Sequence, residues 1–121
     1  MRCDLHHAHL FATNLDESVG FYRRMFRAEV VFDLEVAGAR NVLLRLGSAY
    51  LNFYDQPPKD GGRGVVHHLG IRTDDLEALV AHMEAEGFRF RKGMTTAGPL
   101  KYVMAAGPDG ILLELFETDA F

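Results

Sequence analysis

The chain has 121 residues, of which 48% are hydrophobic and 25% are charged, so length and composition predict one globular domain over residues 1–121. The formal net charge of −4, without clustered Lys and Arg, argues against a nucleic-acid partner. The single cysteine, Cys3, excludes an intrachain disulfide, and no apolar run has the length of a signal peptide or a membrane span. We therefore expect a cytoplasmic protein that has neither a nucleic-acid nor a membrane partner.

The first half of the chain predicts a strand, a helix and three more strands. Residues 5–13 are short and apolar, and residues 15–26 carry apolar side chains at helical spacing. Asn14 lies three residues before Glu17, as in a capping box at the start of a helix. The three following strands, separated by small residues that permit tight turns, are expected at 30–36, 40–46 and 49–55.

The second half predicts the same order of elements. A strand is expected at 65–72 and a helix at 75–86, with Gly87 placed to form a left-handed C-terminal cap. The last three strands are expected at 88–92, 100–106 and 111–117. Pro and Gly residues between the halves indicate a connector, so the expected parts are module one at 1–56, a linker at 57–64 and module two at 65–121.

The two halves also resemble each other residue by residue. A shift of 61 positions lays residues 5–10 on residues 66–71, and His7 then falls on His68. A shift of 62 positions brings Asn52 onto Glu114. A nearly constant offset across a strand, a helix and a further strand favours duplication over coincidence. The expected fold class is α+β: two tandem βαβββ modules that form a curved mixed sheet around a central cavity, with the helices outside.

The histidines and one acidic residue carry the functional prediction. Strand side chains alternate between faces, so His7 and His68 should point away from the helices, toward the concave side of the sheet. Glu114 is a charged residue inside an apolar strand, where a carboxylate needs a partner or a metal. Two imidazoles and one carboxylate can form a facial triad with open coordination positions. The alternative is that each of the three packs in the core or meets solvent.

Further residues are expected to line the same cavity. His9 shares a face with His7 and is a candidate for proton transfer, or else a hydrogen-bonded interior histidine. Tyr50 and Asn52 share one strand face, and Asn52 is more readily a hydrogen-bonding residue than a metal ligand. Two residues of the seventh expected strand, which could instead simply pack, complete the predicted substrate-binding set: Tyr102 and Met104. The remaining histidines are assigned to structure or surface: His6, His67 and His82.

Three segments together resemble the vicinal oxygen chelate superfamily, which includes glyoxalase I, fosfomycin-resistance transferases, methylmalonyl-CoA epimerase, bleomycin-binding proteins and extradiol dioxygenases. They are LHHAHLFATNLDESVGFYRRMF, VHHLGIRTDDLEALVAHMEAEGF and GPDGILLELFE. The resemblance implies paired βαβββ modules around a cavity, often completed by a homodimer, and a divalent metal that binds two oxygens of the substrate. It also implies that His7, His68 and Glu114 are the ligands.

Individual subfamilies match less well. Where proteins that resemble glyoxalase I have Glu and the epimerases have Gln, this chain has Asn52. Fosfomycin transferases and extradiol dioxygenases share the His, His and Glu set, but the potassium loop of the transferases corresponds here to residues 98–100, and their first-strand threonine to His9. Bleomycin-binding proteins lack the metal ligands that this chain retains.

The leading hypothesis is a metal-dependent enzyme, a lyase or oxygenase similar to glyoxalases and extradiol dioxygenases, whose small oxygen-rich substrate chelates the ion. The alternatives are a small-molecule or antibiotic-binding resistance protein of the same fold without catalysis, and a fosfomycin-type thiol transferase. Fe, Mn, Zn and Ni all accept two nitrogens and a carboxylate, so the metal stays open. A homodimer is expected, with modules paired within one chain or exchanged between chains.

Overall fold

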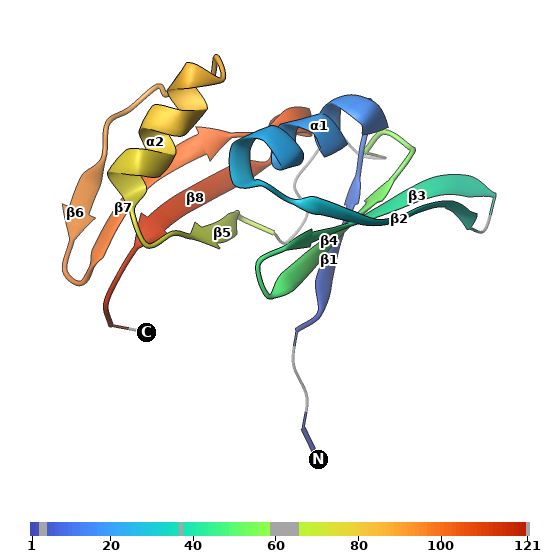
Figure 1. The fold of residues 1–121 in the computed structure, drawn as a ribbon, viewed down its shortest axis with the longest axis horizontal. Helices are drawn as coiled ribbons and strands as arrows, with labels where there is room; N and C mark the ends of the chain where they lie inside the picture. Colours follow the sequence, from blue (N-terminus) through green and yellow to red (C-terminus); the bar gives the residue numbers. More distant parts are fainter. Residues whose placement is uncertain (3–4, 37, 59–65, 121) are drawn as a thin grey trace. The chain divides into compact units, whose positions relative to one another are not determined.

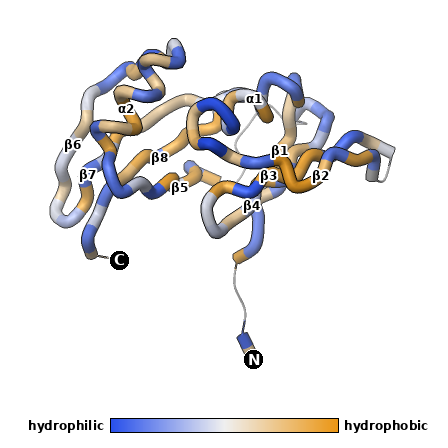
Figure 2. The backbone as a smooth tube through the Cα atoms, in the orientation of Figure 1, coloured by the Kyte–Doolittle hydropathy of each residue, from blue (hydrophilic) through white to orange (hydrophobic). Residues whose placement is uncertain are grey.

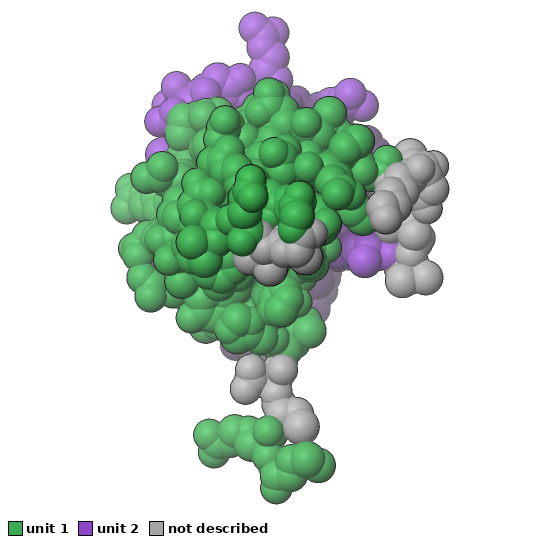
Figure 3. Space-filling model, turned by 90° about the vertical axis from the view of Figure 1, so that its right-hand side faces the viewer, with its two compact units in different colours: residues 1–62 green, residues 63–121 purple. Residues whose placement is uncertain are grey.

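The chain folds into two compact units, Met1–Gly62 and Arg63–Phe121 (Figure 3). The computed structural model describes residues 1–2, 5–36, 38–58 and 66–120. Cys3 and most of the predicted linker lie outside the described residues. Among the helices of the described residues, none is both long enough and apolar enough to cross a membrane.

Unit 1 contains one helix and a four-stranded mixed sheet (Figure 1). Its strands lie in the order β1-β4-β3-β2, with β1 parallel to β4 and the other neighbours antiparallel. In chain order, the elements are β1 (His7–Phe11), α1 (Leu15–Phe26), β2 (Glu29–Val36), β3 (Ala39–Leu46) and β4 (Ala49–Tyr54).

Unit 2 repeats this plan. The strand order β5-β8-β7-β6 has the same connectivity, again with one parallel pair, between β5 and β8. In chain order, the elements are β5 (Leu69–Arg72), α2 (Leu76–Ala85), β6 (Thr95–Ala97), β7 (Leu100–Ala106), the 3₁₀ turn η1 (Pro108–Gly110) and β8 (Leu112–Glu117). The predicted α+β class with βαβββ twice is therefore confirmed.

Side-chain caps begin both helices and fix where they start. Asn14 accepts a hydrogen bond from the Glu17 backbone N–H at 3.1 Å, as the capping pattern predicted. Asp75 caps α2 in the same way, accepting from the Ala78 N–H at 3.0 Å. Gly87 follows α2 with a φ of 94°, the left-handed conformation predicted for it.

Each helix buries its apolar side against its own sheet. In unit 1, Tyr22 of α1 is 1% exposed, and its ring lies 5.2 Å from that of Phe53 on β4. In unit 2, α2 contacts β8 and buries Leu76 and Met83 completely. Figure 2 shows hydrophobic residues along much of β8. One face of each sheet is therefore committed to the core, and only the other face can hold polar chemistry.

The strand predicted at 88–92 is wrong, because the sixth strand is β6, seven residues later at Thr95–Ala97. Phe88 and Phe90 do alternate with exposed residues, as in a strand, but the segment forms no strand. Their two rings pack against each other, with centroids 4.8 Å apart. A two-residue turn joins β6 to β7, and Gly98 provides the φ of 57° that this turn needs. This turn sets the register of the β6–β7 hairpin, in which Thr95–Ala97 pair with residues 100–102 of β7.

Candidate metal site

Unit 1 presents a polar and aromatic face on β1 and β4. His7 and His9 are exposed, whereas the alternate residues of β1 are half-buried, as strand alternation predicted. In the parallel register, His7 lies opposite Tyr50 and His9 lies opposite Asn52. These four side chains, all predicted to belong to the site, therefore share one face of the unit 1 sheet.

Unit 2 presents Glu114 on the corresponding face. Its neighbours Leu113 and Leu115 are both fully buried on the core side of β8, so Glu114 points to the opposite side. The register places Glu114 between Gly70 of β5 and Met104 of β7. Tyr102 and Met104 alternate with buried residues of β7, which puts both predicted substrate contacts on the face of Glu114.

His68 and Glu114 form a pair on this face. The imidazole Nε2 of His68 lies 3.8 Å from Oε2 of Glu114, with 33% and 23% of their side chains exposed. This separation is too long for a hydrogen bond. An imidazole nitrogen and a carboxylate oxygen are both donor types that a divalent metal accepts, so His68 and Glu114 could supply two ligands of a metal site.

The third predicted ligand, His7, belongs to unit 1. Its membership in the triad stays a prediction. Among the described residues, no three His, Cys, Asp or Glu side chains gather closely enough to hold a metal ion. Unit 2 on its own therefore supplies two candidate metal ligands, His68 and Glu114.

The two modules place their candidate ligands by the same geometry. The duplication matches His7 and Asn52 with His68 and Glu114. In both units, the second residue lies opposite the position two residues after the histidine, across the parallel strand pair. The repeat seen in the sequence is thus also a repeat of strand register.

Asn52 ends a short ladder of hydrogen-bonded amides. Asn41 donates to the carbonyl oxygen of Ala39 at 3.2 Å and accepts from Nδ2 of Asn52 at 3.3 Å. A carbonyl can only accept, so it fixes the direction of both amides. The Oδ1 of Asn52 is then a buried acceptor with no hydrogen-bond partner in the described part of the chain. This oxygen can accept a hydrogen bond from a hydroxyl or an N–H group.

Aromatic stacking orders the face of unit 1. The His9 ring stacks on Tyr54 with centroids 5.5 Å apart and an interplanar angle of 22°. The His6 ring stacks on Tyr50 at 4.3 Å and 18°. Strand alternation did not predict the His6 contact. The one available signal in the sequence was that a second histidine precedes His7, as another precedes His68.

A shallow pocket of about 150 Å³ lies elsewhere in unit 2, where β6 turns into β7. Two of its lining residues already have partners: Lys101 donates to Glu77 at 3.1 Å, and Glu117 accepts from the Leu76 N–H at 2.8 Å. The Glu77 carboxylate also raises the pKa of Lys101. We assign no function to this pocket. Its residues are Thr96, Gly98, Pro99, Leu100, Lys101, Glu117, Thr118 and Asp119.

Comparison with known families identifies the fold. The sequence matches the Glyoxalase/Bleomycin resistance protein/Dioxygenase superfamily over residues 4–115. The chain belongs to this superfamily. Members of this superfamily differ in chemistry, so membership alone leaves the activity open.

Solved structures of the superfamily share the fold at low sequence identity. A glyoxylase/bleomycin resistance protein/dioxygenase domain from Frankia sp. EAN1pec is 16% identical, with a TM-score of 0.83 over 98% of this chain and 99% of that one. A mutant of the fosfomycin resistance protein FosX from Listeria monocytogenes, complexed with Mn(II) and 1S,2S-dihydroxypropylphosphonic acid, is 17% identical, with a TM-score of 0.75 over 95% and 90%.

Lactoylglutathione lyase from Agrobacterium tumefaciens is another structural neighbour. It is 21% identical and gives a TM-score of 0.72 over 96% of this chain and 94% of that one. Among curated proteins, no sequence matches this chain significantly. The comparisons therefore fix the family and the fold.

Proposed function

We propose that the protein is a metal-dependent enzyme of the glyoxalase/dioxygenase superfamily, a lyase or oxygenase that acts on a small substrate with two adjacent oxygens. The observation that carries this proposal is the pair of His68 and Glu114. An imidazole and a carboxylate face each other at 3.8 Å on the open side of a sheet, without a direct hydrogen bond between them.

The proposed ligands are His7, His68 and Glu114. Two neutral imidazoles and one carboxylate suit Fe, Mn, Zn or Ni and leave coordination positions for substrate. When bound, the ion would act as a Lewis acid toward the chelating oxygens of the substrate. The structural likeness to a FosX complex that contains Mn(II) supports a divalent ion without selecting among these metals.

The other site residues have proposed roles in binding and proton transfer. Asn52 would accept a hydrogen bond from a substrate hydroxyl or N–H, because its Oδ1 is a buried acceptor with no partner in the described residues. Tyr50, Tyr102 and Met104 would line the substrate site. His9, held against Tyr54 by stacking, would move a proton to or from the substrate through an imidazole nitrogen.

A fosfomycin-type thiol transferase is the second candidate, supported by the structural likeness to FosX. The same His, His and Glu set would serve it. A binding protein without catalysis is the remaining alternative. We also propose a homodimer located in the cytoplasm; light scattering would test the dimer by a mass of about twice 13.6 kDa.

Elemental analysis of the purified protein, followed by a metal-loaded activity panel, tests the proposal. Loading uses Fe(II), Mn(II), Zn(II) or Ni(II), and the substrates are methylglyoxal with glutathione, catechols with oxygen, and fosfomycin with thiols. We expect a bound ion and turnover that requires it. Turnover of fosfomycin alone would select the transferase. Absence of bound metal after loading would contradict the enzyme proposal and favour the binding protein.

A further inference from the structure

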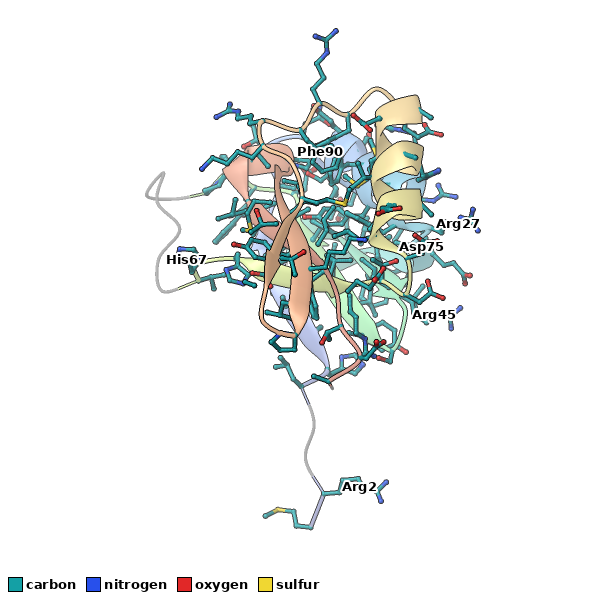
Figure 4. All side chains as sticks on the ribbon, turned by 90° about the vertical axis from the view of Figure 1, so that its left-hand side faces the viewer. Arg2, Arg27, Arg45, His67, Asp75 and Phe90 are labelled. Carbon is teal, nitrogen blue, oxygen red and sulfur yellow. The ribbon has the colours of Figure 1, made fainter. Side chains whose placement is uncertain are left out.

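Both modules place two adjacent histidines in the same contact just before or at the start of the first strand. In unit 1, the Nδ1 atoms of His6 and His7 lie 3.0 Å apart, and in unit 2 those of His67 and His68 lie 2.9 Å apart. The two rings of each pair meet edge to face, at interplanar angles of 89° and 83°. Figure 4 labels His67 where the chain leads into β5. A contact that recurs in both copies of a duplication points to a shared role.

The two ring nitrogens of His68 have different neighbours. Its Nδ1 meets His67, and its Nε2 faces the Glu114 carboxylate. A neutral imidazole carries one N–H, and a nitrogen that binds a metal must offer a lone pair. If Nε2 binds the ion, the proton of His68 resides on Nδ1 and is donated to Nδ1 of His67. The contact between the rings then provides an acceptor for the Nδ1–H of His68, which is the tautomer that can bind metal through Nε2.

We propose that His67 is a positioning residue for His68, and that His6 is the positioning residue for His7. This inference rests on the proposed metal site. Metal-binding histidines almost always donate their second N–H to an acceptor that fixes tautomer and ring orientation. Carboxylates and backbone carbonyls commonly fill that role. Here, the acceptor is the Nδ1 lone pair of the preceding histidine.

Unit 1 adds an anchor to this arrangement. The His6 ring stacks on Tyr50 with centroids 4.3 Å apart, and Tyr50 lies opposite His7 in the β1–β4 register. Tyr50 thus holds His6, and His6 holds the ring of His7. At the repeat-equivalent position, β8 carries Leu112, which has no ring to stack. The orientation of His7 should therefore depend on Tyr50, in addition to His6.

Two substitutions of His67 separate a positioning role from a structural one. His67→Leu removes the acceptor, whereas His67→Asn keeps a side-chain oxygen near the position of Nδ1. His82→Leu, on α2, is the matched loss of a histidine outside the proposed site. Nitrogen-15 NMR of the metal-free proteins reports the tautomer of His68, and competition titration with Zn(II) or Mn(II) reports metal affinity.

We expect His68 to carry its proton on Nδ1 in the wild type. His67→Leu should lose this preference and bind the ion about 10- to 100-fold more weakly, and His67→Asn should restore both. His82→Leu should match the wild type in both measurements. A wild-type His68 protonated on Nε2, or unchanged affinity in His67→Leu, would overturn the proposal. If the wild type binds no metal, the proposed function fails separately, and the tautomer of His68 still decides whether His67 orients it.

Discussion

The carboxylate of Glu114 occupies a position that would otherwise suit an aliphatic residue. Leu113 and Leu115 on either side are fully buried, and the imidazole of His68 lies 3.8 Å from the carboxylate. A partly buried carboxylate held near an imidazole suits a ligand more than a stabilising ion pair, because the two atoms are too far apart for a hydrogen bond. Glu117, three residues on, has a different role, because its carboxylate caps the N-terminus of α2.

These two glutamates give a matched pair of variants. We expect Glu114→Gln to weaken binding of Mn(II) or Zn(II) at least tenfold with little change in the free energy of unfolding. Glu117→Gln should keep metal affinity and lose about 0.5 kcal/mol of stability, because its amide oxygen can still accept the Leu76 N–H but lacks the negative charge that the N-terminus of α2 favours. Competition titration and urea unfolding measure the two effects. Equal metal affinities in both variants would refute the role of Glu114.

For single residues, the sequence predicts which face of a strand a side chain occupies better than it predicts which side chains are in contact. Period-two alternation correctly places His7, His9 and Tyr50 on one face, because the strand geometry alone determines it. The ring contacts of His6 and His67 depend on side-chain torsions and on a neighbouring strand. Alternation carries no information about either, so it gives neither histidine a place in the site.

Among the elements, the helices follow local signals closely. The range predicted for α1, 15–26, is confirmed in full, because a side-chain cap and an amphipathic pattern both specify it. The strand predicted at 88–92 is wrong because alternation says nothing about the availability of a partner strand. Helices are specified by nearby residues, whereas a strand also requires the register of its neighbour.

The end of α2 provides a stability prediction. Gly87 has a φ of 94°, and an added Cβ would meet nothing within 4 Å. Gly87→Ala should therefore cost about 1 kcal/mol through backbone strain alone. Gly93→Ala is the control, since its Cβ also meets open space and its φ is not in the left-handed region. Thermal unfolding compares the two, and equal melting temperatures would contradict the strain argument.

An ion pair between β2 and β3 predicts a pH dependence. Arg40 donates to both carboxylate oxygens of Asp33, at 2.9 and 2.8 Å, and this holds the pKa of Asp33 below its usual value. Such a group stabilises the fold above its unfolded pKa, and the contribution is lost as the pH falls through the lower folded pKa. Below about pH 4, the wild type should lose stability more steeply than Asp33→Asn. Urea unfolding from pH 3 to 7 gives the free energy of unfolding of both proteins at each pH. The same change with pH in the wild type and in Asp33→Asn would contradict this prediction.

For the whole molecule, duplication is the organising feature. Both units have the same strand order, and both place a histidine diagonally across from a polar residue of the adjacent parallel strand. The copies have diverged at that second position, with Asn52 in one and Glu114 in the other. One module therefore carries a carboxylate at this position, and the other carries an amide.

The difference between Asn52 and Glu114 was visible in the sequence, and the resemblance to the superfamily was visible there as well. Three separated segments carried the resemblance, and the match over residues 4–115 confirms it. The activity could not be predicted in the same way, because one framework serves several reactions that differ in a few side chains of the site. Those differences act through positions of single atoms that strand patterns do not encode.

The stoichiometry of bound metal tests the central claim most directly. Wild type, His7→Ala and His68→Ala would be loaded with Zn(II) or Mn(II), desalted and analysed for metal per chain, with His82→Ala as the control. If one ion is shared by ligands from both modules, the wild type and the control will hold one ion per chain, and each ligand variant will lose it while keeping its fold. Full metal content in His7→Ala or in His68→Ala would contradict the shared site.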